Sequence, residues 1–318
     1  MALGPGSGPV AAAAPASSGP VVKMPGLSHI EIPMSGRRAA VAGISMRSMC
    51  RPLSVTIQRA AAAAVMLAGP RVIPGQRSIR SIPVPAPEWA ALRTAWRSAV
   101  GSWDDEVLYR RPQSGRHGFA LLLLRRGRGL AFIRVSPDAG RTAREYSVML
   151  GVHAARPDTF RVAFPLAEGS RHGWGWMAVE SGPNHPTGAL RRAADRLRVV
   201  DEITDILTRT LHRDADTPAH WVGCHGDLSP WNVRTGRGRS VWVIDWEDAQ
   251  FGPPGADLLY SGLTAELTFG SPVVRGAEPE AIEWMRNLVS NRRQPDETEL
   301  SENNRLLAAL DRLRGSSQ

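Results

Sequence analysis

The feature that most constrains the fold is a change of hydrophobic period near Pro186. From about residue 100 to this point, one amphipathic stretch, residues 142–153, predicts a helix, while short apolar runs bounded by turn residues predict strands at 106–111, 119–124, 130–135, 159–166 and 175–180. Beyond Pro186, apolar residues recur at three- and four-residue steps over 190–211, and one short strand is expected at 241–246. A sheet with one helix, followed by a mainly helical half, predicts an α+β fold rather than a doubly wound one.

The stretch before this sheet has a different composition. Residues 1–45 are rich in Gly, Pro, Ala and Ser without sustained periodicity, and residues 71–87 carry four prolines, so both read as unstructured. An Ala-rich helix at 53–69 and the start of ordered structure in a helix at 88–100 are expected. We therefore divide the chain into a disordered or weakly structured basic extension and linker (1–85), a first lobe (86–182) and a second lobe (183–318). A chain starting near Pro70 should keep its chemistry.

The positive charge of the chain is confined to this extension. The formal net charge is +9, and residues 1–100 hold 11 basic and 2 acidic side chains, whereas the remainder is balanced. We expect no specific nucleic-acid partner, although contact of a basic tail with RNA or anionic lipid stays open. The longest apolar run, 60–70, is too short to span a bilayer, and two cysteines make no disulfide framework. A cytoplasmic protein without a membrane partner is expected; an alternative start at Met46 would instead let Arg47, Arg51 and the Ala-rich run imitate a signal peptide.

The candidate chemistry lies between residues 224 and 248. Residues 224–232 read Cys-His-Gly-Asp-Leu-Ser-Pro-Trp-Asn, and the apolar run that follows ends on Asp245. This is a polar loop with two oxygen-bearing side chains, Asp227 and Asn232, five residues apart, and then a strand that ends on a carboxylate. Phosphoryl transfer needs one group that orients the attacking hydroxyl and oxygen ligands that hold Mg²⁺. Asp227 suits the first task, and Asn232 and Asp245 suit the second.

His-Gly-Asp-Leu-x-x-x-Asn followed by Ile-Asp-Trp-Glu resembles the catalytic and metal-binding loops of the aminoglycoside phosphotransferase and choline kinase family. The resemblance implies a bilobal protein-kinase-like fold, with a nucleotide-binding N-lobe and a catalytic, acceptor-binding C-lobe, and it implies ATP and Mg²⁺ as cofactors. It assigns Asp227 as the catalytic base, His225 as a support of the loop, and Asn232 and Asp245 as the Mg²⁺ ligands. The matching Asp257 would brace the helical lobe.

The resemblance also places the nucleotide in the first lobe. Residues 111–118 link the first two strands and could cover the phosphates. The family has a lysine in the third strand, where this chain has Arg134, with Glu145 on the next helix as its expected partner. Backbone groups from Glu180 to Gly182 would bind the adenine. Because a planar guanidinium is not interchangeable with an ammonium, the departure at Arg134 is the main argument for an inactive, nucleotide-binding pseudokinase as the alternative.

The sequence leaves the acceptor open beyond a small hydroxyl-bearing compound, and it leaves the oligomeric state open. An acidic floor for a cationic acceptor is available in the C-terminal region, where Glu266, Glu278, Glu280 and Glu283 occur. The alternative interpretation of these four residues is a solvated helix face.

Overall fold

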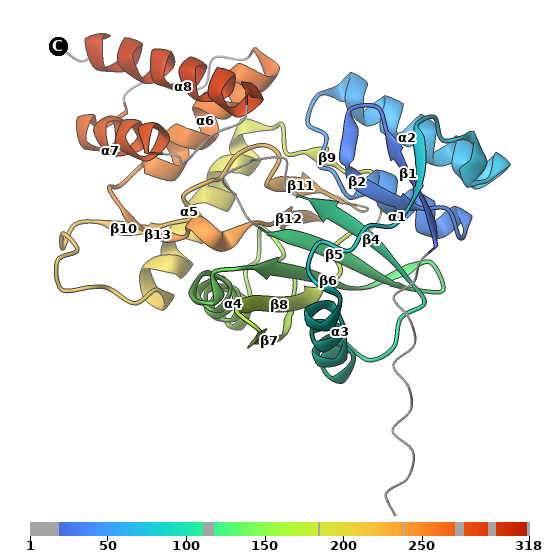
Figure 1. The fold of residues 1–318 in the computed structure, drawn as a ribbon. Coiled ribbons are helices and arrows are strands. Elements are labelled where there is room, and N and C mark those ends of the chain that lie inside the picture. Colours follow the sequence, from blue (N-terminus) through green and yellow to red (C-terminus); the bar gives the residue numbers. More distant parts are fainter. Residues whose placement is uncertain are drawn as a thin grey trace, which may run out of the picture.

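The computed structural model describes residues 19–110, 118–183, 185–236, 238, 240–270, 277–291 and 297–316. Over these residues, one lobe is built on an eight-stranded antiparallel sheet, and the other consists mainly of helices with two small sheets (Figure 1). The α+β, bilobal fold expected from the sequence is confirmed. None of the described helices is long and apolar enough to cross a membrane.

The centre of the large sheet follows the predicted strands closely. These strands are β4 (Asp105–Arg110), β5 (Phe119–Arg125), β6 (Arg128–Ser136) and β8 (Trp174–Glu180), in that spatial order, and β7 (Pro165–Arg171) follows at the edge. On β5 both faces are covered, which explains why its residues form an unbroken apolar run. Leu121 and Leu123 pack with Trp89 and Trp96 of α3 (Ala86–Val100), whereas Leu122 and Leu124 pack on the opposite side with α1 (Arg37–Ser45).

The expectation of a disordered or weakly structured extension at 1–85, with one helix at 53–69, is wrong for much of residues 20–79. β1 (Pro20–Met24), β2 (Leu27–Pro33) and β3 (Gln76–Ile79) extend the sheet in the order β3-β1-β2-β4, and α1 and α2 (Pro52–Ala68) pack on one side of them. Ile30, Ile32 and Ile44 are fully buried there, together with Leu124 of β5. Enough apolar surface is therefore buried to order the segment. The one helix expected before residue 86, at 53–69, is present as α2, whereas α1 was not expected. Residues 1–18 lie outside the described part.

One predicted strand is misplaced. The run at 159–166 was expected to be a strand, but the strand in this region is β7, which begins at Pro165. Phe160, Val162 and Ala163 are buried in the core between the lobes, and Arg161 forms only an isolated bridge to Trp242. The apolar character of the run comes from burial of irregular backbone rather than from sheet pairing.

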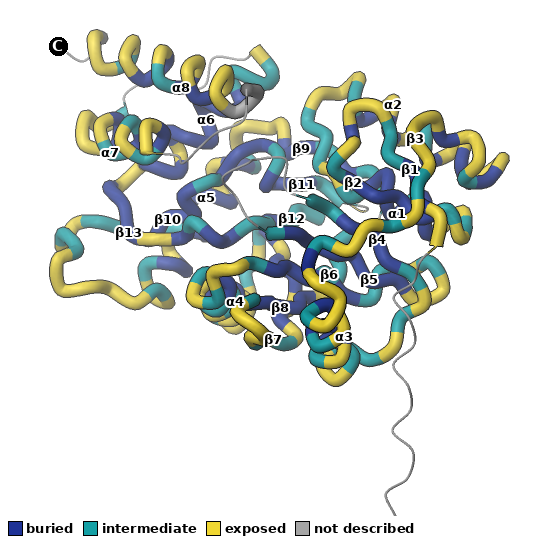
Figure 2. The backbone as a smooth tube through the Cα atoms, in the orientation of Figure 1, coloured by how far each residue is buried: buried dark blue, intermediate teal, exposed yellow. Residues whose placement is uncertain are grey.

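The second lobe begins with β9 (Gly188–Ala189) and α5 (Ala193–Thr210). Residues 222–252 follow as β10 (Val222–Cys224), β11 (Val233–Thr235), β12 (Val241–Val243), the short 3₁₀ helix η3 (Trp246–Asp248) and β13 (Gln250–Gly252). Helices α6 (Ala256–Phe269), α7 (Pro279–Ser290) and α8 (Glu297–Ser316) share one apolar core, which includes Cys224. Figure 2 shows buried backbone through β10 and much of α6, and exposed residues on the outer sides of α2, α7 and α8.

Candidate active site

Two small sheets hold residues 222–252 in place. β10 pairs with β13, and β11 pairs with both β12 and β9, all antiparallel. Between these pairs the backbone of Gly226 has φ +80°, and a Cβ there would lie 2.4 Å from the carbonyl oxygen of Asp248. Only glycine tolerates both the conformation and this close approach. The polar loop and the turn after Asp245 are therefore packed backbone against backbone.

His225 and Asp257 hold the polar loop in place. The buried carboxylate of Asp257, at the start of α6, accepts hydrogen bonds from the backbone N–H groups of His225 (2.6 Å) and Gly226 (3.0 Å). The His225 ring lies 4.7 Å from the Trp246 ring, and its Nδ1 and Nε2 lie near the N–H of Asp227 (3.3 Å) and the carbonyl of Ile244 (3.2 Å). Since an N–H can only donate and a carbonyl can only accept, these partners fit the neutral tautomer protonated on Nε2. His225 thus joins the loop to the strand that precedes Asp245.

The three predicted functional side chains meet at this junction. Asn232 Nδ2 donates to Asp227 Oδ2 (3.0 Å) and to the Asp227 carbonyl (2.9 Å). The register Val233↔Val243 brings Asn232 opposite Ile244, whose N–H donates to the Asn232 carbonyl (3.0 Å). Asp245 follows directly, in a left-handed conformation with φ +67°, which ends the strand and turns the chain. The structure therefore brings Asp227, Asn232 and Asp245 into one small region.

Arg134 reaches this region from the first lobe. Its guanidinium donates to Glu145 of α4 (Ala139–Ala154) at 2.8 Å, to Asp245 at 2.9 Å, and to Glu247. The Arg134–Glu145 pair was predicted, but the contacts with Asp245 and Glu247 were not. A planar fork can bridge three carboxylates from two directions, whereas the single ammonium of a lysine would hold them less rigidly. The extra carboxylate of Glu247 therefore explains why an arginine suits this position better than a lysine.

Arg141, which sequence reasoning also missed, makes a second connection between the lobes. From α4 it contacts Glu247 (2.9 Å) and Asp248 (3.2 Å). The sequence signal for the contacts with Glu247 and Asp248 was the run Asp-Trp-Glu-Asp at 245–248. From the sequence, only Asp245 of this run was assigned a role. Three carboxylates so close together require cations, and the helix after β6 supplies one of them.

The electrostatics of this cluster favour binding of a further cation. Glu145, Asp245, Glu247 and Asp248 share two guanidinium groups, those of Arg134 and Arg141. Burial, with the neighbouring carboxylates, raises the pKa of Glu145 to about 8, although Arg134 opposes this shift. A divalent cation beside Asp245 would lower the cost of keeping these carboxylates charged.

The side-chain oxygens of Asn232 and Asp245 are also of the type that binds Mg²⁺. The described residues contain no cage of three or more His, Cys, Asp or Glu side chains arranged for a metal ion. Mg²⁺ that bridges phosphates needs only one or two protein oxygens, since the phosphates and water supply the others. Asn232 and Asp245, adjacent across the β11–β12 pair, can provide these two oxygens.

Two further expectations concern the binding of the nucleotide. Residues 111–117 of the predicted phosphate-covering loop are outside the described residues. The N–H of Glu180 donates to the carbonyl of Phe164 (2.8 Å), so this one of the backbone groups expected to bind adenine is engaged within the sheet. The adenine site at Glu180 to Gly182 stays a prediction. Met177 and Trp176 are buried core residues.

Replacing Arg134 by alanine is expected to destabilise the protein strongly. Removal of one partner from a buried ion cluster leaves the others uncompensated, which costs about 3–5 kcal/mol in free energy of unfolding. The free energy of unfolding of Arg134→Lys should lie between those of wild type and Arg134→Ala, because a single ammonium replaces the planar guanidinium. Urea unfolding measures both effects, and an alanine variant within about 1 kcal/mol of wild type would contradict the ion cluster.

The burial of His225 should make the free energy of unfolding fall in mild acid. Burial lowers the pKa of His225, so below the unfolded value of about 6.5 the unfolded chain binds more protons and stability falls as pH falls. Between pH 7.5 and 5.5 this loss is at most about 1.4 kcal/mol. We expect His225→Gln to lose correspondingly less over the same interval in urea titrations. Equal losses in the two proteins would show that His225 is not held neutral.

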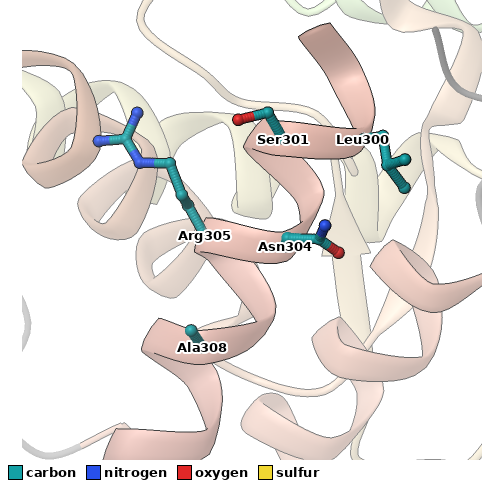
Figure 3. A pocket seen from close by; sticks show the side chains of 5 residues that line it. All are labelled: Leu300, Ser301, Asn304, Arg305 and Ala308. Carbon is teal, nitrogen blue, oxygen red and sulfur yellow. The ribbon is translucent and has the colours of Figure 1, made fainter. Parts of the chain in front are cut away.

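A surface hollow on α8 is unrelated to these residues. It measures about 460 Å³ and is lined by side chains of one helix, among them Leu300, Ser301 and Arg305 (Figure 3). None of the functional residues described above takes part in it. It therefore does not mark the nucleotide site.

Solved structures similar to this chain include phosphotransferases. Spectinomycin phosphotransferase APH(9)-Ia, in complex with ADP and spectinomycin, is 11% identical with a TM-score of 0.46, covering 72% of this chain and 95% of that one. A thermostable mutant of aminoglycoside phosphotransferase APH(4)-Ia is 14% identical (TM-score 0.46; 70% and 98% covered). A putative fructosamine-3-kinase from Haemophilus somnus is 11% identical (TM-score 0.44; 70% and 97% covered). No curated protein sequence matches the chain significantly.

The sequence itself matches a family model over residues 76–288, which is more than half of the chain and contains every candidate site residue described above. The match begins at β3, after β1, β2, α1 and α2. The chain belongs to the phosphotransferase enzyme family.

Proposed function

We propose that this protein is a kinase that transfers the γ-phosphoryl group of ATP to a hydroxyl group of a small molecule. The observation that carries the proposal is the convergence of Asp227, Asn232 and Asp245 at the junction of the lobes, with the Arg134–Glu145 pair facing them. One carboxylate, two metal-type oxygen donors and a cation from the sheet are the groups that phosphoryl transfer requires.

In the proposed reaction, Asp227 accepts the proton of the acceptor hydroxyl. The hydroxyl oxygen forms a bond to the γ-phosphorus, the bond from that phosphorus to the bridging oxygen breaks, and ADP leaves with the bonding electron pair. Asn232 fixes the Asp227 carboxylate through its Nδ2 donor, which sets the direction in which the proton is accepted. The close backbone packing at Gly226 and the hydrogen bonds from the loop N–H groups to the Asp257 carboxylate hold the loop that carries the base.

Mg²⁺, when bound, would neutralise phosphate charge in the transition state. Asn232 and Asp245 would hold it. Arg134 would place positive charge beside the phosphates while it holds Glu145 and Asp245. The adenine would bind to backbone groups at the end of β8 and just after it, at residues 180–182.

A pseudokinase is the second candidate, and one contact favours it. The ion pair between Arg134 and Asp245 (2.9 Å) engages the carboxylate that would ligate Mg²⁺. If this pair persists with nucleotide, the protein would bind ATP without metal-assisted turnover. The dependence of nucleotide binding on Mg²⁺ separates the two candidates.

Asp245→Asn is expected to remove the Mg²⁺-dependent part of the stabilisation by ATP. The substitution keeps the size of the side chain but removes the charge that attracts a divalent cation. In thermal-shift measurements, wild type should gain several degrees more with MgATP than with ATP and EDTA, because binding to the native state alone raises the melting temperature. Asp201→Asn, at an exposed position of α5, is the matched control. An undiminished Mg²⁺ effect in Asp245→Asn would refute the assignment.

A further inference from the structure

A second cavity, of about 220 Å³, lies beside the catalytic loop. Its wall includes Trp231 of that loop, Thr264 and Thr268 of α6, and Arg305 of α8. Residues 47–51, which connect α1 to α2, and Ser54 in the first turn of α2 form another side. The cavity thus lies between the N-terminal extension and the helical lobe.

The connecting segment is held firmly by both lobes. The buried side chain of Gln58 donates from Nε2 to the carbonyls of Ile44 (2.7 Å) and Arg47 (3.0 Å), which fixes the turn after α1. From the other lobe, the buried Arg234 of β11 donates to Thr187 Oγ1 (2.7 Å) and to the Ser45 carbonyl (3.5 Å). A wall fixed from two directions can define the shape of a binding site.

Trp231 places this cavity next to the reacting groups. It is four residues from Asp227, so the two Cα atoms are at most about 14 Å apart, and it immediately precedes Asn232. The intervening turn is tight, because the N–H of Asn232 donates to the Ser229 carbonyl (3.0 Å) and that of Ser229 to the Asp227 carbonyl (2.9 Å). An acceptor lying against Trp231 would be close to the proposed base.

The charge of the wall is positive. Three arginines, Arg47, Arg51 and Arg305, line the cavity together with one carboxylate, Glu302. Arg47 donates to the Gly26 carbonyl (2.7 Å) and Arg305 to the Leu267 carbonyl (3.3 Å), contacts that position the guanidinium groups without neutralising them.

The acidic floor considered from the sequence does not form here. Glu280 contacts His220 and Trp221, and Glu283 contacts Arg314 (3.4 Å). Neither these residues nor Glu266 and Glu278 line the cavity. A polycationic acceptor would therefore meet like charge at this wall, whereas a carboxylate or phosphate group would find several guanidinium donors.

We propose that this cavity is the acceptor site and that it takes a small hydroxyl compound carrying an anionic group. The inference rests on the proposed kinase function. Arg47 and Arg51, which belong to the extension and lie outside the family match, and Arg305 of α8 bind the anionic group; Trp231 contacts the carbon skeleton. The small volume selects a compound the size of a sugar acid rather than an oligosaccharide.

The test measures binding of three compounds that differ in charge but little in size: D-gluconate, D-glucose and D-glucosamine. In calorimetric titrations of the full chain with MgADP present, gluconate is expected to bind at least about tenfold more tightly than glucosamine, since a charged hydrogen bond is worth about that factor. Arg305→Glu should abolish or reverse this order. Arg59→Gln, at an exposed position of α2 away from the cavity, is the control and should preserve it.

Two results would overturn the proposal: glucosamine or glucose binding as tightly as gluconate, or an order of affinities that survives Arg305→Glu. An anionic group could also belong to the nucleotide, so the affinity for MgATP is measured in the same variants. It should stay within about twofold, and a tenfold loss in Arg305→Glu would assign the arginines to ATP instead. The proposed function is tested separately through Asp245→Asn. If MgATP binding depends on Asp245 but the charge order is absent, only the acceptor inference fails.

Discussion

A chain that starts at Pro70 is expected to lose cooperative folding, contrary to what the composition of the extension suggests. The truncation removes β1, β2, α1 and α2, and with them the fully buried Ile30, Ile32 and Ile44. It also uncovers Val107, Leu122 and Leu124, which are buried against the extension. Each such side chain contributes about 1.5–3 kcal/mol by burial, so together they rival the whole net stability of a domain, about 5–15 kcal/mol.

Thermal melts followed by circular dichroism test this expectation. The matched control starts at Gly19 and keeps every described residue, and we expect it to melt like the full chain. Aggregation or a broad, non-cooperative transition in the shorter protein is the expected outcome. If the chain from Pro70 melts cooperatively within about 5 °C of the full chain, the packing of the extension on the sheet is wrong.

Asp227→Asn is expected to lower turnover by about a hundred- to ten-thousandfold, the usual contribution of a general base. The amide keeps the size of the side chain and can still accept from Asn232, so the loop should stay in place. Because the base acts on the acceptor hydroxyl and not on the nucleotide, the affinity for MgATP should change little. The loss should therefore appear in kcat rather than in KM for ATP.

The measurement is ADP release in the presence of an accepted hydroxyl compound, compared with the dissociation constant of MgATP. Asp216→Asn, at an exposed loop position, is the control and should retain full turnover. An Asp227→Asn protein that keeps more than a tenth of wild-type kcat would show that another group accepts the proton.

The strands β4, β5, β6 and β8 and the helices α3 and α4 could be predicted because each shows its own hydrophobic period over enough residues. The extension could not. Its strands are short and lie among Gly, Pro and Ala, and they are stabilised by pairing and packing with residues far along the chain, as in Ile30↔Tyr109. Tertiary burial outweighed local composition there.

The same distinction holds for the site. Asp227, Asn232 and Asp245 have a fixed spacing in the sequence, and the resemblance to the family pointed to Arg134 and Glu145 on successive elements, so these candidates could be named from the sequence. The contacts of Arg134 and Arg141 with Glu247 join residues more than a hundred positions apart, and no periodicity reports such a meeting. The wall at residues 47–51 depends in the same way on how the extension folds back.

The strand order β3-β1-β2-β4 also has a consequence for the way this protein is made. β1 and β2 leave the ribosome first, but β2 pairs with β4, which is synthesised some eighty residues later, as the register Glu31↔Leu108 shows. The contact of Ser45 with Arg234 closes a loop of 189 residues, far longer still. Contacts so distant in sequence form slowly, because the chain loses much entropy before they contribute stability. The first strands synthesised must therefore wait with an unpaired edge, a period in which nascent chains are open to aggregation and to capture by chaperones.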